Sequence, residues 1–583
     1  MDISSLNGTV GLVKDLFDAK VPTSAAVNFK DRKPEFIFNG IEQPFPRATP
    51  EDEGISSRHI RDFLSELKND KTLRMHNVIV LRHGKIICEA TFGNSDLHIW
   101  KMTFSACKSI VSLAIGMLID AGKLNLKDKL LDIFPEYNSA VLKLKLRDIT
   151  VENLLNMTSC LTFNEFACMV TNDWEKAFLK SAIVGKSGED FNYNSLNTYM
   201  LAAVVKKITG LTLTEFLTPR LFNPLGISNF HWEKGPNGIE KGGWGLYMLP
   251  EDFAKIGQLV MQNGVWNGER IVSEEWVRKA TSKQVTTPEN CGDFNYGYQF
   301  WVGRSTDKFL LNGMMGQNIL GYRENSVLII TNAGNDEMFQ QSNYFSIAEK
   351  YFGRKFDDRL ERCDVDYEAL CDTVEELKYK GKQKSGFFAR LFTAKVRPDI
   401  LYFCEDLNGK LFTTESKNAA SVGFLPLMLQ AIQNNYTKGF ISISFNVNRN
   451  DLFMNYAEEG LSLTIPLGTT GYIKSKIDYN GENYIISANA TLSHDEDENK
   501  VIIISVDFLE TFASRKIKIY FKDDKVILKQ IEFPGADFIT EGINSAKNNF
   551  TGSKILGNAI SKIEDDYIKY KCNCVFAPEI ELK

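Results

Sequence analysis

The 583-residue sequence lacks the features that mark several common classes of protein. It has 68 Lys and Arg against 74 Asp and Glu, and a net charge of −6 argues against general nucleic-acid binding. Its most apolar stretch, Ile110 to Ile119, is too short to span a bilayer and predicts a buried helix instead. The first residues contain no basic segment followed by an apolar one, so we expect no secretory signal and a cytoplasmic location.

Metal-site and disulfide patterns are also scarce. The six histidines form no zinc-type spacing, and the ten cysteines form neither a regular framework nor a paired C-x-x-C set. This distribution favours free thiols in a reducing compartment over disulfides. Cys572 and Cys574 offer a soft-metal site as an alternative, but no second pair lies nearby in the sequence. We therefore expect no metal and no organic cofactor.

The chain is too long for a single hydrophobic core, so we expect two or three domains. The character of the sequence suggests an N-terminal extension (residues 1–43), a first domain (44–352), a helical and basic linker (353–400) and a β-rich C-terminal domain (401–583). The extension has one amphipathic helical pattern, near Val10 to Phe17. In the linker, Gly381 to Gly386 is a flexible connector, and Phe387 to Arg397 fits packing between domains better than a membrane surface.

Strand patterns lie at both ends of the first domain, and helical patterns lie between them. Asn77 to Arg82 and Lys85 to Phe92 flank a two-residue His-Gly turn, which predicts a hairpin. Helical patterns cover residues 105–121, 151–155 and 196–208, and strand patterns return at residues 296–302, 308–311, 317–322 and 326–331. This order predicts one antiparallel sheet that holds both ends of the domain, with a helical subdomain beside it.

The C-terminal region reads as a series of short strands with turns between them. They are expected at residues 439–447, 461–466, 484–490, 501–508, 516–521 and 526–533. Even spacing of this kind predicts a small barrel or a sandwich. No catalytic motif is visible there.

A serine nucleophile needs a base for its proton and N–H donors for the oxyanion. A lysine one helical turn away can be that base, and S-x-x-K occurs at Ser65, Ser105 and Ser305. Only Ser105 begins a long apolar helix, whose burial would lower the pKa of Lys108. Taken alone, the pair is better explained by a capping serine and a lysine that extends to solvent.

The surroundings of Ser105 favour the catalytic interpretation. Residues 100–109, 149–161, 191–195, 242–258 and 263–276 resemble, in order, conserved blocks of the class C β-lactamase-like serine hydrolases. These include penicillin-binding proteins, carboxylesterases, D-amino-acid peptidases and amide-oligomer hydrolases. The resemblance covers about residues 44 to 350. It implies a β-lactamase-like fold, an antiparallel sheet flanked by helices with a helical subdomain.

The same resemblance implies roles for individual residues. Ser105 would be the nucleophile, and Lys108 with Tyr193 would accept the proton and return it to the leaving group. Ser195 would be a polar partner facing the site. Cys107, inside the first motif, reads as a packing residue.

The third motif of the family, K/H-x-G, departs from the usual pattern. Leu311-Asn312-Gly313 occupies its place and leads into Met314, in a variant that ends G-x-x-G-Q. The resemblance implies that the backbone N–H groups of Met314 and Ser105 hold the oxyanion, with Asn312 and Gly313 in the substrate-binding strand. Leu311 replaces the cation that holds a substrate carboxylate in lactam-binding members. Cys160 likewise stands where relatives carry glycine.

These observations predict a serine hydrolase that forms an acyl-enzyme and acts on a small ester, amide or lactam. A carboxylesterase or amidase/peptidase is favoured over a β-lactamase or D,D-peptidase, because of Leu311 and the missing signal. An alternative from another class is a binding or sensor protein that does not turn over and acts through its C-terminal domain. In such folds the walls that select the substrate come from loops, here residues 163–188 and 283–295. The motifs therefore do not indicate the natural substrate.

Overall fold

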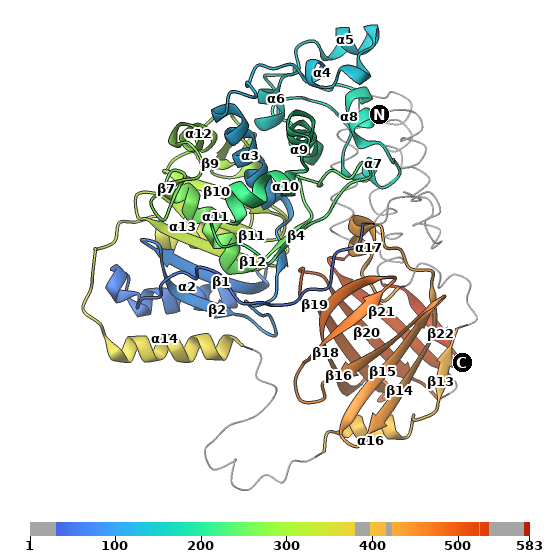
Figure 1. The fold of residues 1–583 in the computed structure, drawn as a ribbon. Coiled ribbons are helices and arrows are strands. Elements are labelled where there is room, and N and C mark those ends of the chain that lie inside the picture. The colour runs from blue at the N-terminus through green and yellow to red at the C-terminus, as the bar shows by residue number, and fades with distance from the viewer. Residues whose placement is uncertain (1–30, 379–396, 415–422, 524, 536–576) are drawn as a thin grey trace. The chain divides into compact units, whose positions relative to one another are not determined.

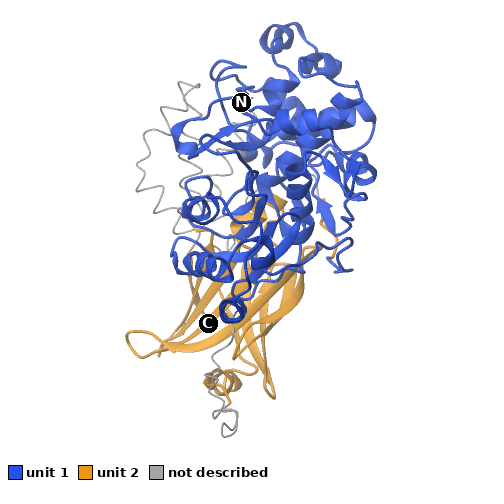
Figure 2. Cartoon of the chain, turned by 90° about the vertical axis from the view of Figure 1, so that its left-hand side faces the viewer, with its two compact units in different colours: residues 1–2, 36–378 blue, residues 3–35, 379–583 orange. Residues whose placement is uncertain are grey.

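A computed structural model describes residues 31–378, 397–414, 423–523, 525–535 and 577–583. Of these, residues 36–378 form one compact unit, and residues 31–35 join those from 397 onward in a second (Figure 2). The predictions made for Val10 to Phe17, Gly381 to Gly386 and the two C-terminal cysteines lie outside the described residues, as does nearly all of Phe387 to Arg397. The finer domain boundaries stay predictions.

The first unit is built on one seven-stranded sheet with the order β2-β1-β12-β11-β10-β9-β8. Every neighbouring pair is antiparallel, and β1 lies beside β12, so both ends of the domain share one sheet as predicted. The strands are β1 (Met75–Arg82), β2 (Lys85–Thr91), β8 (Phe294–Tyr296), β9 (Trp301–Gly303), β10 (Lys308–Gly313), β11 (Gln317–Tyr322) and β12 (Val327–Ala333).

Turn residues shape this sheet in two places. His83 and Gly84 have φ of 47° and 74°, the left-handed pair that a two-residue hairpin between β1 and β2 requires. The single strand predicted over residues 296–302 is wrong, because the chain turns back between β8 and β9. Gln299 stands in that turn with φ 65°, and its side-chain amide donates to the carbonyls of Leu154 and Leu155.

Helices cover both faces of the sheet (Figure 1). The main ones are α2 (Ser57–Asn69), α3 (Lys108–Asp120), α9 (Ser195–Thr209), α11 (Pro250–Met261), α13 (Asn343–Phe352) and α14 (Asp364–Leu377). In β1, Ile79 and Leu81 enter one core with α3, α9 and α11, while Val78 and Val80 enter another with α2 and α13. The alternation of a strand thus separates two buried cores.

Shorter elements complete the helical side of this unit. They are α4 (Leu130–Ile133), α5 (Ala140–Leu146), α6 (Val151–Leu155), α7 (Glu165–Cys168), α8 (Trp174–Lys180), α10 (Leu213–Leu217), α12 (Glu274–Ala280) and two small sheets, β3 (Lys101–Met102) with β5 (Leu246–Met248) and β4 (Phe230–Trp232), and β6 (Val265–Trp266) with β7 (Glu269–Arg270). Both α3 and α9 are buried along most of their length.

The described residues of the second unit form two antiparallel sheets and the helices α16 (Asp399–Glu405) and α17 (Leu427–Gln433). One sheet holds β13 (Leu411–Thr413), β14 (Phe440–Asn448), β15 (Asp451–Glu458) and β16 (Leu461–Leu467), and the other holds β17 (Ile473–Tyr479), β18 (Glu482–His494), β19 (Lys500–Phe508), β20 (Ser514–Phe521), β21 (Val526–Phe533) and β22 (Glu579–Leu582). Of the two architectures expected, the closed barrel is wrong. Neither sheet closes on itself, although Thr413 and Lys583 exchange backbone hydrogen bonds at the sheet edges.

Two ion pairs are buried inside the second unit. The guanidinium of Arg515 lies 2.8 Å from the carboxylate of Glu532, and both side chains are almost fully buried. Lys33 makes a similar buried pair with Glu510 at 3.0 Å. Pairing offsets the cost of removing each charge from water, so these groups are held in place by their partners.

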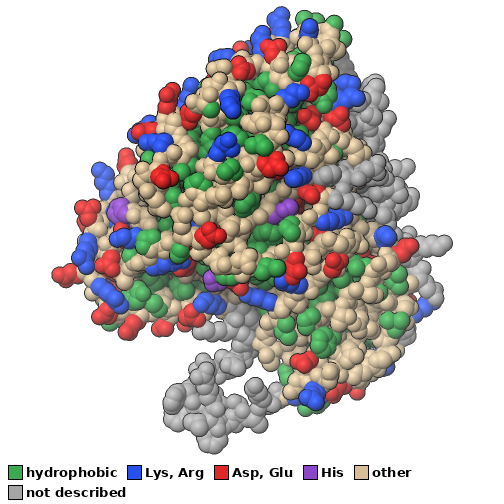
Figure 3. All heavy atoms as spheres, viewed as in Figure 1, with side chains coloured by type: hydrophobic (Ala, Val, Ile, Leu, Met, Phe, Trp, Pro, Cys, Tyr) green, Lys and Arg blue, Asp and Glu red, His purple; other side chains and the backbone are tan. Residues whose placement is uncertain are grey.

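The surface of the described chain carries charges of both signs. On the face drawn in Figure 3, the Lys and Arg side chains are interspersed with Asp and Glu, and neither sign gathers over a broad area. No helix among the described residues is long and apolar enough to cross a membrane.

Candidate active site

Ser105 lies in a tight turn that precedes α3. The turn, η2 (Phe104–Cys107), is a 3₁₀ helix, and Phe104 adopts φ 46° although its side chain is buried. A bulky residue in the left-handed region is strained and persists only where the surrounding structure holds it. Between residues 101 and 110, Ser105 alone is not buried. The turn therefore presents one hydroxyl to solvent from an otherwise buried segment.

Lys108, the first residue of α3, directs its amine to that hydroxyl. Its Nζ lies 2.7 Å from Ser105 Oγ, 3.0 Å from Ser195 Oγ and 2.6 Å from the carbonyl oxygen of Gly243. Among the described residues, no carboxylate forms an ion pair with Lys108, and burial lowers its pKa to about 8. A neutral amine fits these partners, because it can donate to Ser195 and Gly243 and accept the Ser105 proton with its lone pair.

Tyr193 completes the group. The Ser105 hydroxyl lies close enough to its phenol to influence the pKa of that group, and Lys108 Nζ lies 5.1 Å from the centroid of its ring. Burial raises the pKa of the phenol well above its usual value, so it keeps its proton at neutral pH. The ring stacks on Trp301 at 5.7 Å, which fixes its orientation. The structure thus brings together the hydroxyl, the amine and the phenol that the sequence singled out.

The start of α9 places Ser195 beside Lys108. Asn194 caps this helix by accepting a hydrogen bond from the Leu196 N–H at 2.9 Å. Its side-chain amide also donates to the carbonyls of Leu161 and Phe163, at 2.8 Å each, which ties the preceding loop to the helix. Ser195 is therefore held rigidly as the second hydroxyl within reach of the amine.

Gly243 is a site residue whose role the sequence did not indicate. Gly243 lies in the conserved block at residues 242–258, which begins Gly-Gly-x-Gly-Leu, but the sequence did not predict that the Gly243 carbonyl holds Lys108. A side chain at this position would place its Cβ 2.6 Å from the Ser195 carbonyl oxygen. Glycine thus lets the two backbones approach closely enough for the Gly243 carbonyl and the Ser195 hydroxyl to contact one amine.

The end of β10 lies next to the turn that carries Ser105. At Gly313 a Cβ would lie 2.3 Å from the carbonyl oxygen of Thr103, so only glycine fits there. Within the part of the chain that the structure describes, the backbone N–H groups of Ser105 and Met314 donate to no other residue. Two unpaired donors near the hydroxyl suit an oxyanion. Their role stays a prediction.

Two further residues of the third motif do not join this group. Leu311 is fully buried in the core with α3, so it offers substrate no contact. The Asn312 side chain is also buried, donating to Asn318 at 2.7 Å and accepting from Gln340 at 2.9 Å. Successive strand residues face opposite sides, so Asn312 points away from the side on which Gly313 meets Thr103.

A carboxylate that no sequence pattern indicated lies at the site. Glu165, the first residue of α7, accepts a hydrogen bond from the backbone N–H of Ser195 at 3.3 Å. Its negative charge raises the pKa of both Lys108 and Tyr193, which reflects its proximity to them. The segment around it carries no motif and no clear periodicity, so only the folded structure reveals it.

The cysteines near the site have structural environments. Cys107 is buried and donates to the carbonyl of Gly242, and burial raises the pKa of its thiol to about 12. It therefore stays protonated, in line with a packing residue. Cys160 adopts φ 58°, the left-handed region, which explains why glycine suits that position in relatives.

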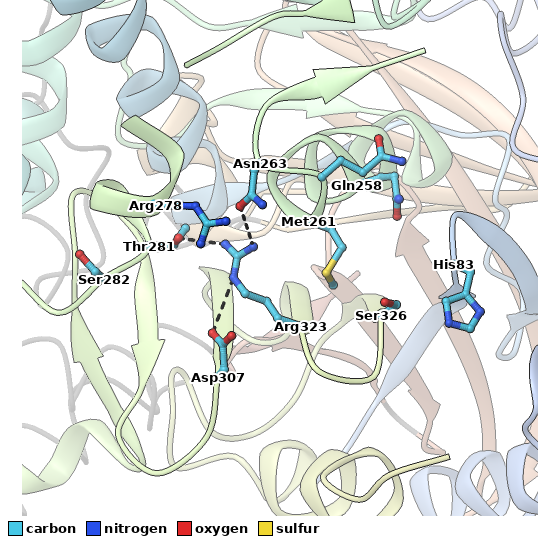
Figure 4. Close-up of a pocket in the computed structure, with 11 residues that line it drawn as sticks. His83, Gln258, Met261, Asn263, Arg278, Thr281, Ser282, Asp307, Arg323 and Ser326 are labelled. Atoms are coloured by element: carbon cyan, nitrogen blue, oxygen red, sulfur yellow. Dashed lines mark hydrogen bonds and ion pairs between the residues drawn. The ribbon is translucent and has the colours of Figure 1, made fainter. Parts of the chain in front are cut away.

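A hollow of about 570 Å³ elsewhere in the first unit has a different character (Figure 4). Its polar lining includes Arg323, which donates to Thr281 at 2.9 Å and lies 3.7 Å from the Asp307 carboxylate. None of Ser105, Lys108 and Tyr193 lines it. No group of three or more metal-ligating side chains occurs among the described residues.

Comparison with known proteins identifies relatives of the first unit. Residues 61–350 match the Beta-lactamase family. The 6-aminohexanoate-dimer hydrolase of Paenarthrobacter ureafaciens is 26% identical over 286 residues, which cover 43% of this chain and 70% of the relative. Penicillin-binding protein 4* of Bacillus subtilis (strain 168) is 19% identical over 52% of this chain and 78% of its own length.

Solved structures show the same kind of likeness. A putative 6-aminohexanoate-dimer hydrolase from Bacillus anthracis aligns with a TM-score of 0.46 and 17% identity, over 58% of this chain and 91% of that one. A family VIII carboxylesterase aligns with a TM-score of 0.43 and 15% identity, over 53% and 100%. Residues 61–350 of this chain therefore belong to the Beta-lactamase family, and the predicted sheet and helical subdomain lie within them.

Proposed function

We propose that the first unit is a serine hydrolase that forms an acyl-enzyme on Ser105 and cleaves an ester or amide bond. The observation that carries this proposal is the buried Lys108 amine, 2.7 Å from Ser105 Oγ and without a carboxylate partner among the described residues. Burial holds its pKa near 8, so a useful fraction of the amine is neutral at physiological pH. A neutral amine can accept the proton of the serine hydroxyl.

The geometry supports the following sequence of steps. Ser105 Oγ attacks the substrate carbonyl carbon while its proton passes to Lys108 Nζ, and the N–H groups of Ser105 and Met314 hold the resulting oxyanion. Collapse of the tetrahedral intermediate breaks the bond to the leaving group. Tyr193 donates its phenolic proton to that group and regains a proton from Lys108. Water then attacks the acyl-enzyme, assisted by the same two residues, and Ser105 is released.

Esters and amides are favoured over lactams as substrates, because the third motif supplies no cation. Leu311 occupies the place of a carboxylate-binding lysine or histidine and is fully buried. A relative named a 6-aminohexanoate-dimer hydrolase supports hydrolysis as the reaction class. A β-lactamase or D,D-peptidase is the second candidate. Faster turnover of nitrocefin than of p-nitrophenyl acetate would reverse this order.

Covalent labelling of the full chain tests the nucleophile. A fluorophosphonate should add one adduct to the wild-type protein by intact mass, and Ser105→Ala should abolish both the adduct and hydrolysis of p-nitrophenyl acetate. Ser65→Ala is the matched control, since Ser65 also begins an S-x-x-K motif but donates to the Arg61 carbonyl within α2. Labelling that survives in Ser105→Ala removes Ser105 from the role. A permanent adduct with a substrate ester, without turnover, would favour the non-turnover sensor.

A further inference from the structure

Glu165 is fixed at the active site by the start of α9. Its Oε1 accepts the Ser195 N–H at 3.3 Å, and the Ser195 hydroxyl in turn accepts from Lys108 Nζ at 3.0 Å. The preceding loop is tied to the same helix through the two hydrogen bonds from Asn194 to the carbonyls of Leu161 and Phe163. The carboxylate is therefore separated from the amine by a single residue, on a segment with little freedom to move away.

Within the described residues, no ion pair neutralises the charge of Glu165. No lysine, arginine or histidine of the described chain forms an ion pair with it, and its Oε2 accepts no hydrogen bond from a described residue. The side chain is only partly buried. Lys241, a cation directly before the block at residues 242–258, instead pairs with Glu233 at 2.6 Å. One negative charge thus stays open at the site.

The aromatic wall of the site, formed by Tyr193, Trp301 and Phe339, carries no charge. Tyr193 packs against Trp301 and, at 6.3 Å between centroids, against Phe339, whose side chain is 39% exposed. The third motif adds no charge, since Leu311 is buried. A substrate bound at Ser105 therefore lies near both an uncharged aromatic cluster and a carboxylate.

We infer that Glu165 is a specificity-determining residue that selects esters or amides bearing an ammonium group near the scissile carbonyl and rejects those bearing a carboxylate. The inference rests on the proposed hydrolase function. An ammonium beside Glu165 gains an opposite charge in a partly desolvated site and can also rest against the aromatic wall. A substrate carboxylate meets a like charge, and no cation compensates for the water that it loses.

Three p-nitrophenyl esters of matched chain length test this inference: an acyl chain ending in trimethylammonium, an uncharged chain and a chain ending in carboxylate. A second series places the same three groups on the alcohol side. In at least one series the wild-type kcat/KM should be about tenfold higher for the ammonium ester than for the uncharged one, mainly through KM, and lower for the carboxylate ester. Glu165→Gln should remove most of this ranking, measured as the ratios of kcat/KM among the three esters within the variant.

Glu189→Gln is the matched control, because it removes the same charge from an exposed position on the loop that follows. Glu189 is not among the groups that shift the pKa of Lys108 or Tyr193, so this variant should keep the wild-type ranking. A wild-type enzyme that hydrolyses all three esters of both series equally overturns the inference while leaving the proposed function intact. Failure to hydrolyse or be labelled by any ester overturns the proposed function instead.

Discussion

Two buried lysines of the first unit each contact the side chain three residues earlier, but the chemical type of that side chain differs. Lys255 on α11 lies one helical turn after Asp252, with 2.7 Å between Nζ and Oδ1, and both side chains are almost fully buried. Lys108 lies one helical turn after Ser105, at 2.7 Å from its hydroxyl. The spacing and the burial are alike. The residue three positions earlier differs: it supplies a carboxylate to Lys255 and a hydroxyl to Lys108.

This difference decides what each amine can do. A carboxylate in contact favours the charged form of a lysine, and the pair then acts as a structural unit. Among the described residues, the hydrogen-bond partners of the Lys108 amine are two hydroxyls and a carbonyl oxygen. Burial therefore lowers its pKa. The same helical spacing gives a structural ion pair at α11 and a candidate base at α3.

The largest expected effect is the loss of activity on removing the unpaired amine. Lys108→Met should lower kcat/KM for an uncharged ester by about 10³-fold, within the range that a positioned general base contributes. Lys108→Arg should be similarly inactive, because a guanidinium stays protonated. Initial rates with p-nitrophenyl acetate measure both variants. Activity within tenfold of wild type in Lys108→Met would show that this amine is not the base.

The second effect concerns stability and should fall on the other lysine. Lys255→Met leaves Asp252 buried and unpaired, which should lower the free energy of unfolding by about 3–5 kcal/mol. Lys108→Met leaves no stranded charge and should change it by about 1 kcal/mol or less. All seven tryptophans lie between residues 100 and 301, so fluorescence during urea unfolding reports the first unit alone. Equal losses in the two variants would contradict the comparison.

The pH profile gives a smaller but more specific test. Because burial lowers the pKa of Lys108 to about 8, the neutral amine predominates only above that pH. The kcat/KM for an uncharged ester should therefore rise with pH up to about 8 and then level off. The raised pKa of the Tyr193 phenol keeps it protonated across this range, so no second ionisation should intervene. A flat profile between pH 6 and 9 would contradict this assignment.

Much of the first unit could be predicted because its signals are periodic or ordered. The hairpin around His83 follows from alternating apolar residues and a turn dipeptide, and the sheet that holds both ends follows from strands at both ends of the domain. Ser105, Lys108 and Tyr193 were found through ordered motifs, and the structure places them together. Their catalytic roles stay predictions.

What the sequence did not reveal depends on the folded backbone. The carbonyl of Gly243 and the left-handed Gln299 involve backbone groups, which no side-chain pattern encodes. Asn312 was grouped with Gly313 because they are adjacent, yet neighbours in a strand face opposite sides. In the second unit, strand alternation predicted the strands but cannot tell a barrel from open sheets, since both bury alternate residues. Glu165 begins the short helix α7, in a segment whose sequence shows no motif and no clear periodicity.

The site of Lys108 also contains a carboxylate, that of Glu165, but this carboxylate does not touch the amine. Asp252 touches its lysine, whereas Glu165 contacts Ser195 and acts on Lys108 only through its charge. That charge raises the pKa of Lys108, so Glu165→Gln should move the midpoint of the pH profile for an uncharged ester to lower pH, by about one unit or less. More of the amine would then be neutral at pH 7. A midpoint that stays in place or moves upward would show that Glu165 exerts no field on the amine.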